Sequence, residues 1–125
     1  MADPTVRPAL LLPLAEALRS GRVPVQAHLD GALAWAARVE SRVRSLLPEP
    51  GRAHRLGEAA EALTRRWPEP STRPPFFGVP VGVKDIFAVD GLPTRAGSAL
   101  PPEEFAMAEG SAVRRLRDAG AVVFG

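Results

Sequence analysis

The stretch Val79-Pro80-Val81-Gly82-Val83-Lys84-Asp85 decides the fold of this chain. It is a short, apolar, β-prone run, which predicts a strand over residues 79–84. Because side chains alternate between the two faces of a strand, we expect the valines and Asp85 on one face, which forms part of the core, and Lys84 on the opposite face. Gly82 leaves room beside Lys84 for a partner group or a ligand.

Lys84 is the only lysine in the chain, since Lys and Arg together number 16 and the remaining fifteen are arginine. A guanidinium group stays protonated in proteins, whereas a buried lysine amine can lose its proton and act as a base or nucleophile. We therefore single out Lys84 as the candidate catalytic residue. The pattern alone leaves open the alternative of an exposed lysine at the end of a strand. Asp85, on the other face, is not expected to pair with Lys84 and hold its amine in the charged form.

Composition limits the classes of function. The 125 residues are 46% hydrophobic and 24% charged, with a net charge of +2, which is typical of one soluble domain. No arginine cluster is interleaved with aromatic residues, so no nucleic-acid partner is expected. The chain has no cysteine, and His28 and His54 lie too far apart for a zinc site, so we expect no metal. The leucine run at residues 10–12 is too short to span a membrane, and we expect a cytoplasmic protein without membrane contact.

Residues 1–67 are predicted to be helical. Apolar residues recur there at intervals of three and four in three segments. These segments are residues 10–20, ended by Gly21; residues 24–47, with Pro24 at the first helical position and Ser45 to Leu47 in the last turn; and residues 53–67, with a Glu61–Arg65 ion pair on the solvent face.

A change in composition follows. Residues 68–75 form a proline-rich, extended linker, and residues 76–125 are predicted to begin an α/β core. After the first strand we expect a second extended stretch at residues 86–89, a turn at Asp90-Gly91, a helix capped by Ser111 and ended by Gly120, and a buried strand at residues 121–124. A parallel strand buried on both faces needs neighbours on both sides. We therefore expect residues 1–125 to be the N-terminal portion of a single, longer domain.

Three blocks of the chain resemble the amidase signature family. Residues 77–85 resemble its "hGIPhhVKD" stretch, residues 90–98 its "GLPTTAGS" segment, and residues 112–125 the helix and strand that follow. The blocks occur in the family's order with its short gaps. The resemblance implies an α/β fold in which N-terminal helices precede and cover a mixed sheet. It also implies that the whole protein hydrolyses a carboxamide of a small molecule with a Ser–cis-Ser–Lys triad and without metal or cofactor.

In this resemblance Lys84 is the triad lysine, a neutral base that takes the proton of the nucleophilic serine through the cis-serine. Both serines and the oxyanion-hole amides belong to a downstream Gly/Ser-rich segment that this chain lacks, so the chain alone is expected to be inactive. Gly125 matches the glycine that precedes "KTN" in the family, which again suggests that the natural chain continues. Arg95 and Glu109 replace a common Thr and Asp of the family.

Two alternatives stay open. One is the A subunit of a tRNA-dependent amidotransferase, which shares the same blocks and works with partner subunits. The other is a short, non-catalytic interaction module, which would have a stop codon after Gly125. The sequence does not indicate which amide is the substrate or what the oligomeric state is.

Overall fold

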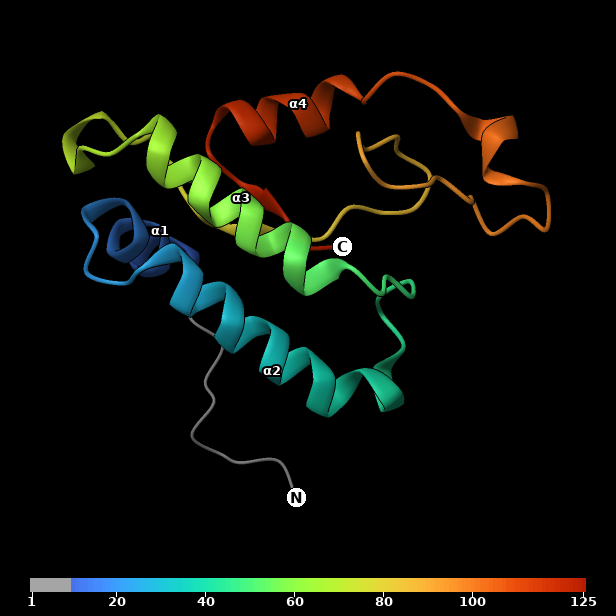
Figure 1. Cartoon of the computed structure of the whole chain (residues 1–125), viewed down its shortest axis with the longest axis horizontal. Helices are drawn as coiled ribbons and strands as arrows, with labels where there is room; N and C mark the ends of the chain where they lie inside the picture. Colours follow the sequence, from blue (N-terminus) through green and yellow to red (C-terminus); the bar gives the residue numbers. More distant parts are fainter. Residues whose placement is uncertain (1–9) are drawn as a thin grey trace.

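The computed structural model describes residues 10–125 and shows the predicted α/β class (Figure 1). Two short strands are combined with four α-helices and two 3-10 turns within that range. In chain order these elements are α1 (Leu11–Ser20), α2 (Val25–Val43), α3 (Arg52–Arg66), a 3-10 turn (Pro70–Thr72), β1 (Pro80–Val81), a 3-10 turn (Pro102–Phe105), α4 (Ser111–Asp118) and β2 (Val122–Val123).

The two strands form a parallel pair that separates two layers. Pro80 pairs with Val122, and Val81 pairs with Val123. Because consecutive side chains of a strand point to opposite faces, Val122 packs with helices α1, α2 and α3, and Val123 packs with α4. Figure 1 accordingly shows α2 and α3 on one side and α4 on the other. A parallel pair needs such a crossover connection, and α4 lies in it.

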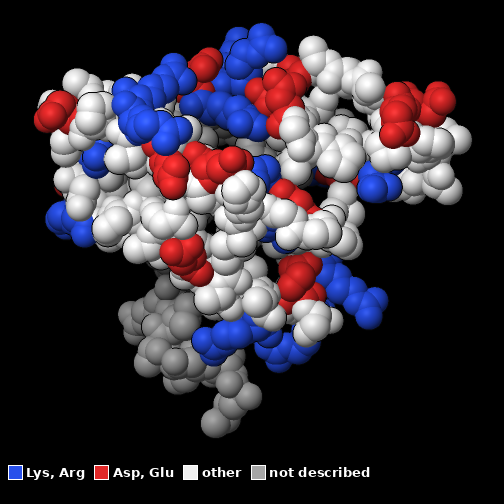
Figure 2. Space-filling view, viewed as in Figure 1, with Lys and Arg blue, Asp and Glu red and all other residues white. Residues whose placement is uncertain are grey.

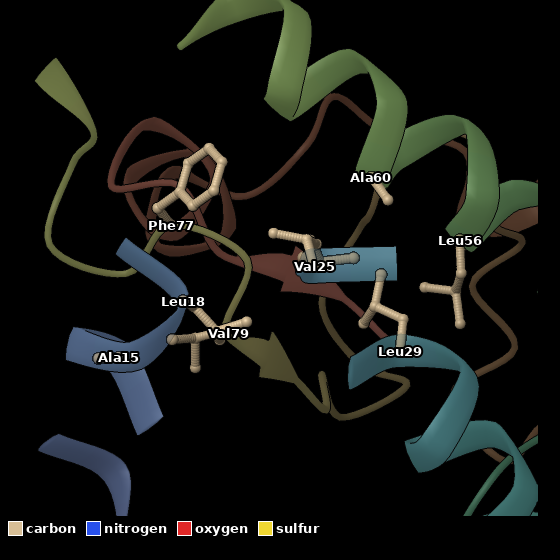
Figure 3. Packing of buried hydrophobic residues seen from close by; sticks show 9 residues of the cluster. Ala15, Leu18, Val25, Leu29, Leu56, Ala60, Phe77 and Val79 are labelled. Atoms are coloured by element: carbon tan, nitrogen blue, oxygen red, sulfur yellow. The ribbon is translucent and has the colours of Figure 1, made fainter. Parts of the chain in front are cut away.

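The larger core fills the space between α1, α2, α3 and the sheet (Figure 3). Its largest fully buried side chains come from all three helices and from the segment before β1: Leu18, Leu29, Leu56 and Phe77. Burying each such side chain contributes about 1.5–3 kcal/mol. The helical spacing of the apolar residues in the sequence therefore serves to cover one face of the sheet.

Arg73 ties the ends of two helices to this core. Its guanidinium donates to the carbonyls of Leu18 (3.4 Å) and Arg19 (3.3 Å) at the end of α1, and to the carbonyl of Trp67 (3.1 Å) after α3. It also stacks over the ring of Phe77 at 4.4 Å. A positive charge is stabilising at the C-terminal end of a helix, where the last carbonyls have no hydrogen-bond donor within the helix.

Several local predictions are confirmed. Helices α1 and α3 lie where the periodicity placed them, and Glu61 pairs with Arg65 at 3.5 Å. A turn forms at Asp90-Gly91, where the Leu92 amide donates to the Val89 carbonyl (3.1 Å).

The predicted end of α2 is wrong. The helix stops at Val43 instead of continuing to Leu47, and Arg44 adopts a left-handed conformation (φ 48°). The reason is a competing set of hydrogen bonds. The Glu40 carboxylate accepts the Leu46 amide (2.6 Å) and the Ser45 hydroxyl (2.8 Å), and the bond from the Leu46 amide is the main cause of a lowered pKa at Glu40.

Two predicted caps also differ. Pro24 is the residue before the first helical residue of α2, not the first position itself. Gly110 occupies the N-cap position of α4, and Ser111 is the first helical residue, with no side-chain capping bond. The backbone of Pro24 is extended, as is usual for the residue before a helix, and no side chain accepts a capping hydrogen bond from the first turn of α2.

The strand around Lys84 is shorter than predicted. Residues 86–89 form no strand, since Ile86 and Phe87 lie in a turn and a bend and only Val89 forms an isolated antiparallel bridge, with Leu92. Only Pro80 and Val81 form the strand itself, two further backbone bonds extend the pairing to Val83, and the chain turns directly after Lys84. Val79 does not share the face of the later valines. Its amide closes a turn onto the Phe76 carbonyl (2.9 Å), and its side chain joins the larger core.

Candidate functional site

Lys84 lies at the edge of the sheet where both parallel strands end. The Phe124 amide donates to the Val81 carbonyl (2.8 Å), and the Val83 amide donates to the Gly125 carbonyl (2.9 Å). The pairing therefore continues beyond β1 as far as the residue before Lys84. The carboxyl ends of parallel strands are where α/β proteins commonly build their sites.

The Lys84 side chain is exposed and lines a cavity of about 440 Å³. Residues after both strands and the loop between α2 and α3 form its walls. Ser45 also lines the cavity, and its hydroxyl donates its hydrogen bond to the Glu40 carboxylate. The cavity thus offers one primary amine with room around it.

A tight turn fixes the backbone at Lys84. The Lys84 carbonyl accepts both the Ile86 amide (2.8 Å) and the Phe87 amide (3.0 Å). These bonds replace the extended stretch predicted here, and they direct the chain away from the sheet immediately after the lysine.

Asp85 does not pair with Lys84, as predicted. Its Oδ1 accepts the Arg95 amide (2.9 Å), and its backbone carbonyl accepts the Ala96 amide (3.0 Å). Across residues 10–125, no carboxylate oxygen lies within 4.0 Å of the Lys84 amine. The carboxylate next to the lysine in sequence is therefore used to bind the chain ten residues later.

Glu49 and Arg52 line one side of the cavity, and Arg55, which is hydrogen-bonded to Glu49, links this side to the sheet. Glu49 accepts hydrogen bonds from Arg52 (Nε, 3.1 Å) and from Arg55 (Nη2, 3.0 Å). Arg55 also donates to the carbonyls of Val123 (2.6 Å) and Phe124 (3.1 Å), so it links the loop before α3 to the end of β2. The hydrogen bond from Arg55 is the main cause of the lowered pKa of Glu49. This cluster was not predicted from the sequence, although the charged residues spaced three apart at 49, 52 and 55 were a signal.

Glu109 anchors the turn that carries Val89 and Leu92, two residues that line the cavity. Its side chain is 5% exposed, and Oε1 accepts the Arg117 Nε (2.9 Å) and the Asp90 amide (3.2 Å). Arg117 in turn donates to the Asp90 carbonyl (3.3 Å), and the Gly110 amide donates to Ala88 (3.1 Å). The turn at residues 88–92 is thereby fastened to α4. From sequence, Glu109 stood out only as a departure from the family pattern.

The other titratable groups belong to different parts of the surface. His28 is half-buried on α2, where burial lowers its pKa, and His54 on α3 lies 3.5 Å from Glu58. No group of three or more His, Cys, Asp or Glu that could hold a metal occurs among residues 10–125. Charges of both signs are interspersed on the face shown in Figure 2. Over the same residues, no helix is long and apolar enough to cross a membrane.

Comparisons with known proteins agree with one another. The family model for Amidase matches residues 37–125. The A subunit of glutamyl-tRNA(Gln) amidotransferase from Nitratidesulfovibrio vulgaris is 39% identical over 99 residues, covering 77% of this chain and 19% of that protein. An amidase from Pseudomonas putida is 35% identical over 120 residues, covering 92% of this chain and 24% of that protein.

A solved structure extends the agreement to the fold. The peptide amidase of Stenotrophomonas maltophilia superimposes with a TM-score of 0.74 at 27% identity, covering 98% of this chain and 25% of that one. The chain thus spans about a fifth to a quarter of the length of the curated relatives it matches.

Proposed function

Because the chain belongs to the amidase family, we propose that it is the lysine-bearing, N-terminal portion of an enzyme that cleaves a small-molecule carboxamide, with Lys84 as its base. The observation that carries this proposal is the place of Lys84. The only lysine of the chain follows β1 at the carboxyl edge of the sheet and lines a cavity of about 440 Å³. In this proposal residues 1–67 are the helical region, residues 68–75 a linker and residues 76–125 the start of the α/β core.

The proposed chemistry is acyl transfer through serine. A nucleophilic serine attacks the amide carbonyl, and its proton passes through a second serine to the neutral Lys84 Nζ. Lys84 then returns the proton to the leaving nitrogen, which gives an acyl-serine and a free amine or ammonia, and water hydrolyses the acyl-serine. Both serines would come from a Gly/Ser-rich segment downstream of residue 125. That segment would also have to cover Lys84, because removal from water favours the neutral amine.

A second candidate is the A subunit of a tRNA-dependent amidotransferase. Relatives with that name, such as the one from Nitratidesulfovibrio vulgaris, favour it. In that role Lys84 would act as the base in cleaving an amide, and the ammonia released would be transferred to a charged tRNA. Partner subunits would be required. Copurification of partner subunits, and ammonia transfer that depends on them, separate this candidate from a free-standing amidase.

The first test is to determine the reading frame beyond codon 125. The proposal expects Lys-Thr-Asn followed by a Gly/Ser-rich segment with two serines. A stop codon directly after Gly125 would overturn it and leave the short, non-catalytic interaction module.

The second test is mutation of Lys84 in the complete protein, with ammonia release from a panel of carboxamides as the assay. Lys84→Ala and Lys84→Arg should each lower kcat by about 10²–10⁴-fold, because arginine keeps the charge but does not act as a base. Arg114→Ala, an exposed residue of α4, is the matched control and should leave kcat unchanged. Substantial activity in Lys84→Arg would show that Lys84 supplies only positive charge.

A further inference from the structure

Asp85 carries an inference that rests on the proposed role of Lys84. We propose that Asp85 is a positioning residue, which closes the loop after Lys84 and keeps its own carboxylate away from the lysine amine. It does so through backbone amides of residues 95 and 96, without contacting the substrate. The family resemblance and the proposed triad do not assign this role.

Asp85 closes the loop of residues 85–96 at its base with two hydrogen bonds. Oδ1 accepts the Arg95 amide (2.9 Å), and the Asp85 carbonyl accepts the Ala96 amide (3.0 Å). The far end of this loop is held separately, since the Asp90 amide donates to the buried Glu109 carboxylate (3.2 Å). Without the acceptor at Asp85, the loop keeps its far anchor and loses one of the two bonds that close its base.

The closed base of the loop lies directly beside the lysine. The Lys84 carbonyl accepts the amides of Ile86 and Phe87, so the first turn of the loop begins at the residue that carries the amine. Motion of the loop base therefore moves the backbone of Lys84. A base must lie within hydrogen-bond reach of the proton that it accepts, and a displacement of about 1 Å can cost about 10²-fold in rate.

The same contact directs the Asp85 carboxylate elsewhere. A carboxylate next to Lys84 would favour the protonated amine, which is the wrong form for a base. In the structure the Arg95 amide binds Oδ1, and no carboxylate oxygen among residues 10–125 lies within 4.0 Å of the Lys84 amine. The Arg95 amide thus both closes the base of the loop and holds the Asp85 carboxylate away from the Lys84 amine.

The test compares Asp85→Ala with Asp85→Asn in the complete protein. Asparagine retains an Oδ1 acceptor for the Arg95 amide, whereas alanine removes it. Asp85→Ala should lower kcat by about tenfold or more with KM changed less than about threefold, and Asp85→Asn should restore most of the lost kcat. Hydrogen exchange at the Arg95 and Ala96 amides should rise about tenfold in Asp85→Ala and much less in Asp85→Asn. Asp118→Ala, an exposed carboxylate at the end of α4, is the control.

A second variant acts on the donor instead of the acceptor. Arg95→Pro removes the amide hydrogen that binds Asp85 and leaves the carboxylate free to pair with Lys84. It should lower kcat like Asp85→Ala, and it decides the question if Asp85→Ala does not fold. The carbon-13 signal of dimethylated Lys84, identified by its loss in Lys84→Arg, should shift in Arg95→Pro and stay in place in Asp85→Asn.

Two results would overturn the inference. In one, Asp85→Asn loses as much kcat as Asp85→Ala, which would mean that the charge itself is needed. In the other, Asp85→Ala exchanges faster at residues 95 and 96 but keeps its kcat. A failure of the proposed function gives a different result. In that case Lys84→Ala keeps its activity, while the hydrogen-exchange rates at residues 95 and 96 and the carbon-13 signal of Lys84 still report on the loop.

Discussion

Replacing Gly120 with alanine should strongly destabilise the protein, because two backbone segments meet at this glycine. Gly120 ends the turn after α4 with φ at +92°, a conformation that side chains disfavour. A Cβ atom there would lie 2.8 Å from the Phe77 Cα, 2.9 Å from the Phe77 nitrogen and 2.8 Å from the Pro74 Cγ. Two of these atoms belong to the backbone and the third to a proline ring, so none can move aside cheaply.

The cost follows from two terms. The left-handed backbone costs about 1–2 kcal/mol for a residue with a Cβ, and overpacking costs about 1–3 kcal/mol. We therefore expect Gly120→Ala to lower the free energy of unfolding by about 2–5 kcal/mol, a large part of the total of about 5–15 kcal/mol that is typical of a native protein. The backbone bond from the Gly78 amide to the Gly120 carbonyl (2.9 Å) would be strained in the same change.

Urea unfolding of the complete protein, followed by circular dichroism, measures this effect. With a slope of about 2 kcal/mol per molar urea, the midpoint should fall by about 1–2.5 M. Gly31→Ala is the matched control. Gly31 lies inside α2, and apart from its chain neighbours and the helix's own backbone no atom of residues 10–125 lies within 4 Å of the place that a Cβ would take, so alanine there should raise stability by up to about 1 kcal/mol. A midpoint that does not fall in Gly120→Ala, or that moves in the same direction in both variants, would refute the reasoning.

Two further predictions concern Glu49, which lines the cavity, and Glu109, which holds the turn at residues 88–92. Hydrogen bonds from Arg55 lower the pKa of Glu49 from its ordinary value of 4.5, so this carboxylate stabilises the fold above that pH, and the contribution is lost as the pH falls through the lower folded-state pKa. In urea unfolding between pH 7 and pH 3, Glu49→Gln should therefore lose less stability than the wild type. Glu109→Ala should destabilise by about 1–3 kcal/mol, because the Asp90 amide loses its buried acceptor. Hydrogen exchange should rise first at residues 88–92, and unchanged exchange there would count against the anchoring role of Glu109.

Local patterns in the sequence were enough to predict the helices and the lysine-bearing motif. The apolar spacing places α1 and α3 correctly, because a helix that covers a sheet must present one apolar face. The motif around Lys84 indicates the family, which the match over residues 37–125 bears out. The catalytic role of Lys84 stays a prediction.

Hydrogen bonds of charged side chains decided what the sequence patterns did not reveal. Helix α2 ends early because the Glu40 carboxylate binds the Leu46 amide, a competition that apolar spacing does not register. Arg55 binds carbonyls 68 and 69 residues away, and Asp85 binds the amide of residue 95 instead of its neighbour Lys84. By itself the sequence determined where the helices lie, apart from the end of α2, and which residue is chemically singular. The tertiary structure alone decided the partners of the charged groups, because a carboxylate or guanidinium binds the donors and acceptors that the folded chain brings within reach.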